Sequence, residues 1–150
     1  MEINDFKKYR KIADIIKDDG DSNNLRVNCV TKEIKKGKKT TYAKVVDGKI
    51  KHIFESSDFK SLSRYYKNHN TIKQQGDKAT DSNFAKYPLA KADLDAGKKV
   101  KIYELNGTKK ECLEQYHKQE GKYPDENFQA NKDKIPNEII QKYENIKKSK

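Results

Sequence analysis

The dipeptide Asp47-Gly48 constrains the fold of this chain more than any other feature of the sequence. It lies between two segments rich in β-branched and aromatic residues, 40–46 and 49–55. A two-residue hairpin turn of type I′ needs a positive φ at both central positions, and Asp-Gly is a preferred pair there. The sequence therefore predicts a β-hairpin that turns at Asp47 and Gly48.

The two-residue turn also predicts the register of the hairpin, because alternate side chains of a strand point to opposite sides. One largely apolar side would carry the facing pairs Val45–Ile50, Ala43–His52 and Thr41–Phe54. The opposite side would carry Tyr42, Lys44, Val46, Lys49, Lys51 and Ile53. Lys44 would then lie directly across from Lys51, an arrangement that costs stability unless an anion lies over the pair.

Apolar spacing predicts the elements that precede and follow the hairpin. Phe6, Tyr9, Ile12, Ala13 and Ile16 recur at three-and-four spacing, which is typical of a helix that begins at Asn4 and stops at 18–20. Alternation from residue 25 to about 34 predicts a strand. After the hairpin, a serine cap at 56 or 57 predicts a helix that ends near residue 70, with His69 at its end.

The second half of the chain predicts one more strand and several helices. Residues 71–86 are polar and without period, which indicates a mobile loop. Pro88 and Gly97 would bound a short helix, residues 100–105 form a strand, and Thr108 with Glu111 matches a capping box that opens a helix ending at Gly121. A last helix would begin at 136. No repeat period is evident.

Together these elements predict a single basic α+β domain over residues 1–150, without a linker long enough to separate two cores. The fold class is a small antiparallel sheet of three to four strands packed against helices. The expected order is helix, three strands, helix, short helix, strand and two helices.

The net charge of +11 is concentrated in one part of the chain. Residues 25–67 carry twelve basic and four acidic side chains, a net charge of +8 in under a third of the sequence. Lysine outnumbers arginine 31 to 3. Since arginine is the better residue for bidentate recognition of guanine, contacts to a nucleic acid would be made mainly to its backbone and would be weakly sequence-selective.

The basic turn 35–39, Lys-Lys-Gly-Lys-Lys, and the basic side of the hairpin form a candidate nucleic-acid-binding site. Lysines there could contact phosphates, and Tyr42 could stack on a base. The predicted site residues are Lys35, Lys36, Lys38, Lys39, Tyr42, Lys44, Lys49 and Lys51. A solvated, lysine-rich sheet edge that resists aggregation is the alternative interpretation of the same residues.

Residues 25–69, taken as a three-stranded sheet backed by a helix, resemble in architecture the small DNA-binding modules of the AP2 and integrase arm-binding type. The resemblance implies a sheet face that lies in a DNA groove. It rests on the order of elements, and no diagnostic motif is shared.

The sequence contains none of the common catalytic or cofactor motifs. P-loop, dinucleotide-binding and G-x-S-x-G patterns are absent. His52, His69 and His117 fall on unrelated elements, and Cys112 lies five residues from His117 on a different helix face, which disfavours a shared metal. We therefore expect no catalytic set, no metal site and no cofactor.

The resulting hypothesis is a non-enzymatic nucleic-acid-binding accessory protein whose partner is DNA or RNA. The alternative is a protein-interaction module or small inhibitor, of the kind that phages and mobile elements encode, which docks an acidic protein. The absence of a signal pattern, of a long apolar run and of a C-x-x-C pair with Cys29 or Cys112 leads us to expect a cytoplasmic protein without membrane contact. The sequence does not indicate an oligomeric state.

Overall fold

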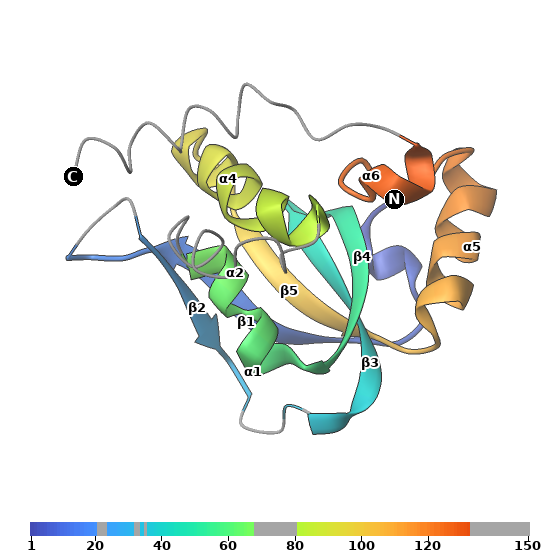
Figure 1. The fold of residues 1–150 in the computed structure, drawn as a ribbon. Helices are drawn as coiled ribbons and strands as arrows, with labels where there is room; N and C mark the ends of the chain where they lie inside the picture. Colours follow the sequence, from blue (N-terminus) through green and yellow to red (C-terminus); the bar gives the residue numbers. More distant parts are fainter. Residues whose placement is uncertain (21–23, 32–33, 35, 68–80, 133–150) are drawn as a thin grey trace.

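A computed structural model describes residues 1–20, 24–31, 34, 36–67 and 81–132 (Figure 1). Its strands are β1 (Tyr9–Lys17), β2 (Leu25–Cys29), β3 (Lys36–Val46), β4 (Lys49–Asp58) and β5 (Val100–Leu105). Its helices are the 3-10 helix η1 (Ile3–Asp5), α1 (Phe59–Leu62), α2 (Arg64–Lys67), α4 (Asp81–Asp95), α5 (Lys109–Glu120) and α6 (Phe128–Asn131). The strands form one antiparallel five-stranded sheet in the order β2-β1-β5-β3-β4.

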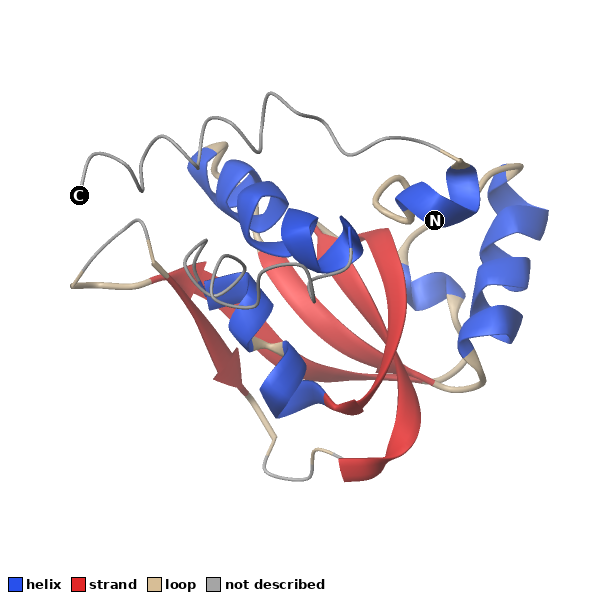
Figure 2. Ribbon diagram, in the orientation of Figure 1, coloured by secondary structure: helices blue, strands red, loops and turns tan. Residues whose placement is uncertain are grey.

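Helices cover both faces of this sheet (Figures 1 and 2). On one face, called here the α4 face, α1, α2 and α4 pack over a core built from Ile12, Ile15, Tyr42, Phe54, Phe59, Tyr66, Tyr87 and Ile102. On the other, the α5 face, Cys112 and Tyr116 of α5 pack with Phe6, Ala43, Val45, Ile53 and Leu105. The side chains of consecutive β3 residues therefore pack on opposite faces of the sheet.

The structure confirms the α+β class, the antiparallel sheet and the two-residue hairpin. Asp47 and Gly48 have φ of 49° and 85°, as a type I′ turn requires, and connect β3 directly to β4. The strand at 100–105 and the helix that Thr108 caps are also confirmed. The Thr108 side chain accepts a hydrogen bond from the Glu111 amide at 3.1 Å, and α5 ends at Gly121 with φ of 76°.

The predicted register of the hairpin is wrong beyond the first pair. Val45 faces Ile50 as expected, but the register then shifts and Lys44 faces His52. Lys51 is thus the extra residue of a β-bulge, and Lys44 does not lie opposite it. The same shift pairs Ala43 with Ile53, and Thr41 with Glu55. The like-charge pair expected from the sequence does not exist.

The predicted first helix is also wrong, because residues 9–17 form strand β1 between β2 and β5. A register shift between Lys11 and Ala13 marks a bulge in this strand. Ile12, Ala13 and Ile15 are all buried in the same core. A bulge places adjacent residues on one face, and the resulting apolar spacing imitates that of a helix.

The middle helices differ from the prediction in their bounds. Strand β4 continues to Asp58, which caps α1 by accepting a hydrogen bond from the Ser61 amide at 3.2 Å. Helix α4 begins at Asp81, inside the predicted loop, and Pro88 lies in its interior instead of at its start. Gly97, with φ of 79°, follows its end as expected. The predicted last helix, the rest of the predicted loop and His69 lie outside the described residues.

The strand order contradicts one further expectation. Strand β2 pairs with β1 and not with β3, so residues 25–69 do not form the three-stranded unit that resembled the AP2 type. Among the described residues, no helix is long and apolar enough to cross a membrane.

Both cysteines are free, with Cys29 exposed and Cys112 buried. Burial, followed by the charge of Glu111, raises the pKa of the Cys112 thiol to about 11.

Candidate functional site

A buried lysine on β3 lies at the centre of a group of charged side chains. The Lys44 side chain is 1 % exposed, and its Nζ lies 2.8 and 3.1 Å from the two carboxylate oxygens of Glu126. Asp93 of α4 places its Oδ2 atom 3.3 Å from the same nitrogen. A buried ammonium group requires such partners, because its desolvation is costly. One cation and two carboxylates are therefore held together on the α4 face.

Glu126 reaches Lys44 because the segment 123–131 is fastened along the outer edge of β4. The Glu126 amide donates to the Lys51 carbonyl at 2.8 Å. The Asn127 side chain accepts from the Ile53 amide at 2.8 Å and donates to the Ile53 carbonyl at 2.7 Å, so it replaces a neighbouring strand. These contacts give hydrogen-bond partners to backbone groups at the edge of the sheet, and they fix the position of the Glu126 carboxylate.

Replacing Asn127 with alanine is expected to destabilise the protein by roughly 2–4 kcal/mol, because it leaves the buried amide and carbonyl of Ile53 without partners. Urea denaturation would measure this loss. The matched control is Gln129→Ala, which truncates an exposed side chain of the same segment and should change the free energy of unfolding by less than about 0.5 kcal/mol. Equal losses in the two variants would contradict the proposed role of Asn127.

Two further basic residues lie beside this ion group, and burial changes the pKa of both. His52 faces Lys44 across the hairpin and is 6 % exposed. Desolvation, helped by the charges of Lys86 and Lys44, holds the His52 pKa well below its ordinary value, so the imidazole is neutral. Lys86 of α4 is 4 % exposed, and desolvation lowers its pKa to about 7 against the opposing effect of Glu126.

His52 and Lys86 line a small hollow between α4 and β4, together with Tyr66, Ala85, Leu89 and Glu126, and the surrounding side chains leave no room in it for a water molecule. The Tyr66 hydroxyl is buried there and makes no hydrogen bond with a described residue. Desolvation and the charge of Glu126 raise its pKa well above the ordinary value. The Lys86 Nζ lies 5.3 Å from the centre of the Phe54 ring and 6.0 Å from that of Tyr66. We name Lys44, His52, Tyr66, Lys86, Asp93 and Glu126 the Lys44–Glu126 cluster.

The chemistry available to the cluster follows from these protonation states. A lysine with a pKa of about 7, such as Lys86, can exchange a proton at neutral pH. Lys44 lies against the carboxylates of Glu126 and Asp93. Carboxylate oxygens are also preferred ligands of hard divalent cations. Among the described residues, however, no group of three or more histidine, cysteine, aspartate or glutamate side chains could hold a metal ion.

The structure separates the residues of the predicted binding site. Tyr42 is 1 % exposed and packs on Phe59 and Phe54, with ring centres 5.0 and 5.7 Å away. Lys44 is buried in the cluster described above. The prediction that Tyr42 and Lys44 share an exposed face is therefore wrong. Both point to the α4 layer. The sequence predicted a helix after the hairpin, but it did not indicate which side of the sheet that helix covers.

The remaining predicted lysines lie at opposite ends of the hairpin. Lys36, Lys38 and Lys39 are exposed at the start of β3, and Lys39 lies 3.7 Å from Glu55. Lys49 and Lys51 lie beside the turn, where Lys51 pairs with Asp125 at 3.5 Å. The ten steps from Lys36 to Val46 span about 33 Å at 3.3 Å per strand residue. Lys35 lies outside the described residues. Nucleic-acid contacts by the exposed lysines stay a prediction.

Sequence reasoning missed most of the cluster. Its six members come from β3, β4, α2, α4 and the segment after α5, so no local spacing connects them. Lys86 lay in the predicted loop, and nothing in the sequence distinguished Asp93 and Glu126 from the other acidic residues. His52 was expected on the buried side of the hairpin and Tyr66 on the buried face of the helix that follows it, and both are buried. The one available signal was the excess of lysine itself, which gave no indication that two lysines would be buried.

Comparisons with known proteins identify the fold. No family model and no curated protein matches the sequence. The chain is similar to a structure described as "Restriction endonuclease HPY188I in complex with product DNA", with a TM-score of 0.51 and 17 % identity over 83 % of this chain and 84 % of that one. It is also similar to the structure of a mutant of EndoII from bacteriophage T4, with a TM-score of 0.46 and 22 % identity over 64 % of both chains. The chain thus spans less than two thirds of EndoII.

The fold is a GIY-YIG-like α+β fold with a five-stranded antiparallel sheet. The two tripeptides in that name, Gly-Ile-Tyr and Tyr-Ile-Gly, do not occur in this sequence. The expectation of a non-enzymatic accessory protein or interaction module is contradicted, because the fold is shared with an enzyme, the restriction endonuclease HPY188I.

Proposed function

We propose that this protein is an endonuclease that cleaves DNA. The observation that carries the proposal is the similarity to HPY188I over more than four fifths of both chains, in a structure whose description names product DNA. The net charge of +11 agrees with a polyanionic substrate. The proposal replaces the accessory role expected from the sequence.

We assign cleavage to the Lys44–Glu126 cluster, whose hollow has to open by side-chain movement before a phosphate and the attacking water can enter. Hydrolysis of a phosphodiester needs a group that takes a proton from the attacking water and positive charge that stabilises the phosphate as negative charge develops on it. Lys86, with a pKa of about 7, has a suitable value for the first role. Lys44, which Glu126 and Asp93 hold in place, is the group that we propose for the second role.

Tyr66 and His52 complete the lining of the hollow in this proposal. The Tyr66 hydroxyl stays protonated because its pKa is raised, so it can donate a hydrogen bond to a phosphate oxygen. The neutral His52 accepts or donates one hydrogen bond without adding charge. Perturbed pKa values that gather around one hollow are typical of functional sites, which favours this group over a purely structural one.

The exposed basic residues near the start of β3 are the proposed DNA-contact surface. Lys36 pairs in register with Asp58, which directly precedes α1, so the open end of the hairpin adjoins α1 and α2. Exposed basic side chains gather there: Lys36, Lys38, Lys39, Lys60, Arg64 and Lys67. Their contacts would be made to phosphates and would weaken as salt rises.

Conversion of supercoiled plasmid tests the proposed activity. The purified protein is incubated with plasmid, with and without a divalent cation, and nicked and linear forms are separated on a gel. We expect nicked or linear plasmid to accumulate with time and protein concentration. Plasmid that stays supercoiled under every condition, with protein shown to be folded by circular dichroism, would contradict the proposal.

A further inference from the structure

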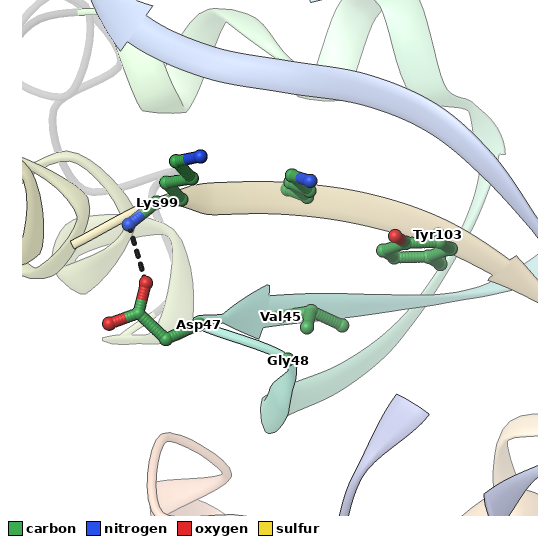
Figure 3. Close-up of a pocket in the computed structure, with 6 residues that line it drawn as sticks. Val45, Asp47, Gly48, Lys99 and Tyr103 are labelled. Atoms are coloured by element: carbon green, nitrogen blue, oxygen red, sulfur yellow. Dashed lines mark hydrogen bonds between the residues drawn. The ribbon is translucent and has the colours of Figure 1, made fainter. Parts of the chain in front are cut away.

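A second hollow lies on the α5 face of the sheet, beside the β3–β4 turn (Figure 3). Its volume is about 200 Å³, and its lining residues are Val45, Asp47, Gly48, Lys99, Lys101 and Tyr103. Val45 follows Lys44 on β3, and adjacent strand residues point to opposite faces. This hollow is therefore separated by the sheet from the Lys44–Glu126 cluster.

Two lysines give the hollow its positive charge. Lys99 and Lys101 alternate with Val100, which is buried in the α4-face core, so both lysines project toward the α5 face. Neither lysine makes an ion pair with a described residue. The neighbouring Asp47 carboxylate accepts a hydrogen bond from the Lys99 backbone amide at 2.9 Å, and this bond fixes the turn against the start of β5.

An aromatic pair lies at one side of the hollow. Tyr103 lines one wall and lies edge-on to Tyr9 of β1, with ring centres 5.8 Å apart. Tyr9 is 43 % exposed. Val45, which is 2 % exposed, supplies an apolar floor. Tyr103 itself is partly buried. Lysines beside accessible aromatic rings on a sheet face are a combination by which proteins bind single-stranded nucleic acids.

We infer that this hollow binds a nucleotide of a single-stranded nucleic acid, with a base on Tyr103 and flanking phosphates on Lys99 and Lys101. Its volume is below the roughly 300–1,000 Å³ of pockets that enclose whole ligands. That size suits one base or sugar of a longer strand better than a free cofactor. The inference goes beyond the proposed cleavage and does not depend on it, because the two sites occupy opposite faces.

The Tyr103→Trp variant provides a direct test, since the chain has no tryptophan and the new side chain reports only on this hollow. Stacking of a base on the indole is expected to quench its fluorescence when a ten-residue oligothymidylate is added at ~50 mM salt. Thymidine monophosphate and a short blunt duplex at the same nucleotide concentration are expected to quench much less. Absence of quenching by the oligonucleotide would overturn the inference, and so would equal quenching by the monophosphate.

A charge test does not rely on that variant folding. In Lys99→Gln/Lys101→Gln, the affinity for the labelled oligonucleotide should fall at least fivefold, and the slope of log K against log salt should decrease by about 1.4, which is 0.7 for each lost phosphate contact. The matched control is Lys98→Gln/Lys110→Gln, which removes the same charge from exposed positions outside the hollow. Equal changes in affinity and slope in the two double variants would overturn the inference.

Discussion

Replacing Lys86 with methionine is expected to slow DNA cleavage at least about 100-fold, because the variant lacks the group proposed to accept a proton from the attacking water. The loss should not come from unfolding. Methionine fills a volume similar to that of lysine. The substitution also removes an amine whose charged form is disfavoured by burial, as the Lys86 pKa of about 7 indicates. The free energy of unfolding at pH 7 is therefore expected to stay the same or rise.

Single-turnover nicking rates of the wild-type protein between pH 5.5 and 8.5 would check this role. If Lys86 is the proton acceptor, the rate rises about tenfold per pH unit below its pKa of about 7 and levels off above it. Lys98→Met is the matched control, because Lys98 is exposed and outside the cluster. A Lys86→Met variant that cleaves as fast as this control would contradict the assignment.

Lys86 also links stability to pH. Its pKa is about 7 in the folded protein and about 10.5 when exposed. Between these values the unfolded chain binds a proton that the folded chain does not, so the free energy of unfolding rises with pH across this window. In Lys86→Met, the contribution of Lys86 to the slope of the free energy of unfolding against pH is lost. Urea denaturation of both proteins at pH 7, 8 and 9 would reveal the difference in slope.

Replacing Lys44 with methionine is expected to destabilise the protein by about 3–5 kcal/mol, the usual cost of removing one partner of a buried ion pair. Glu126 and Asp93 would then share a buried site without a cation. Lys51→Met is the matched control on the neighbouring strand. Its ion pair with Asp125 is partly exposed, so its loss should cost at most about 1 kcal/mol.

Urea denaturation of both variants would measure these costs. Adding Glu126→Gln to Lys44→Met should recover part of the loss, because the second change removes one of the two uncompensated carboxylates. A Lys44→Met variant that loses less than about 1 kcal/mol would contradict the description of Lys44 as a buried, paired charge.

The elements that the sequence predicted correctly are those with a local physical cause. The Asp47-Gly48 turn, the Thr108 capping box and the glycine at 121 each act within a few residues, and each is present. Two of the errors came from bulges, whose causes are not local. The bulge in β1 made a strand look like a helix, and the bulge at Lys51 changed the residue opposite Lys44 from Lys51 to His52. Lys44 is buried for another reason, because α4 covers its side of the sheet.

The candidate site could not be predicted for the same reason. Lys44 and Glu126 are 82 positions apart and meet only because Asn127 fastens its segment to the edge of β4. Burial then lowers the pKa of Lys86, and burial is a property of the assembled layers. The charge of the sequence indicated a polyanion as partner, but the sequence offered none of the motifs that would have indicated an enzyme.

The most direct test of the central claim compares plasmid nicking by the wild-type protein, Glu126→Gln and Glu114→Gln. The control residue Glu114 is exposed on α5, away from the cluster. All three proteins are assayed at a temperature where circular dichroism shows them to be folded. We expect the wild-type protein and Glu114→Gln to nick the plasmid at similar rates, whereas Glu126→Gln should be at least about 100-fold slower. Nicking by folded Glu126→Gln at the rate of Glu114→Gln would contradict the assignment of cleavage to the Lys44–Glu126 cluster.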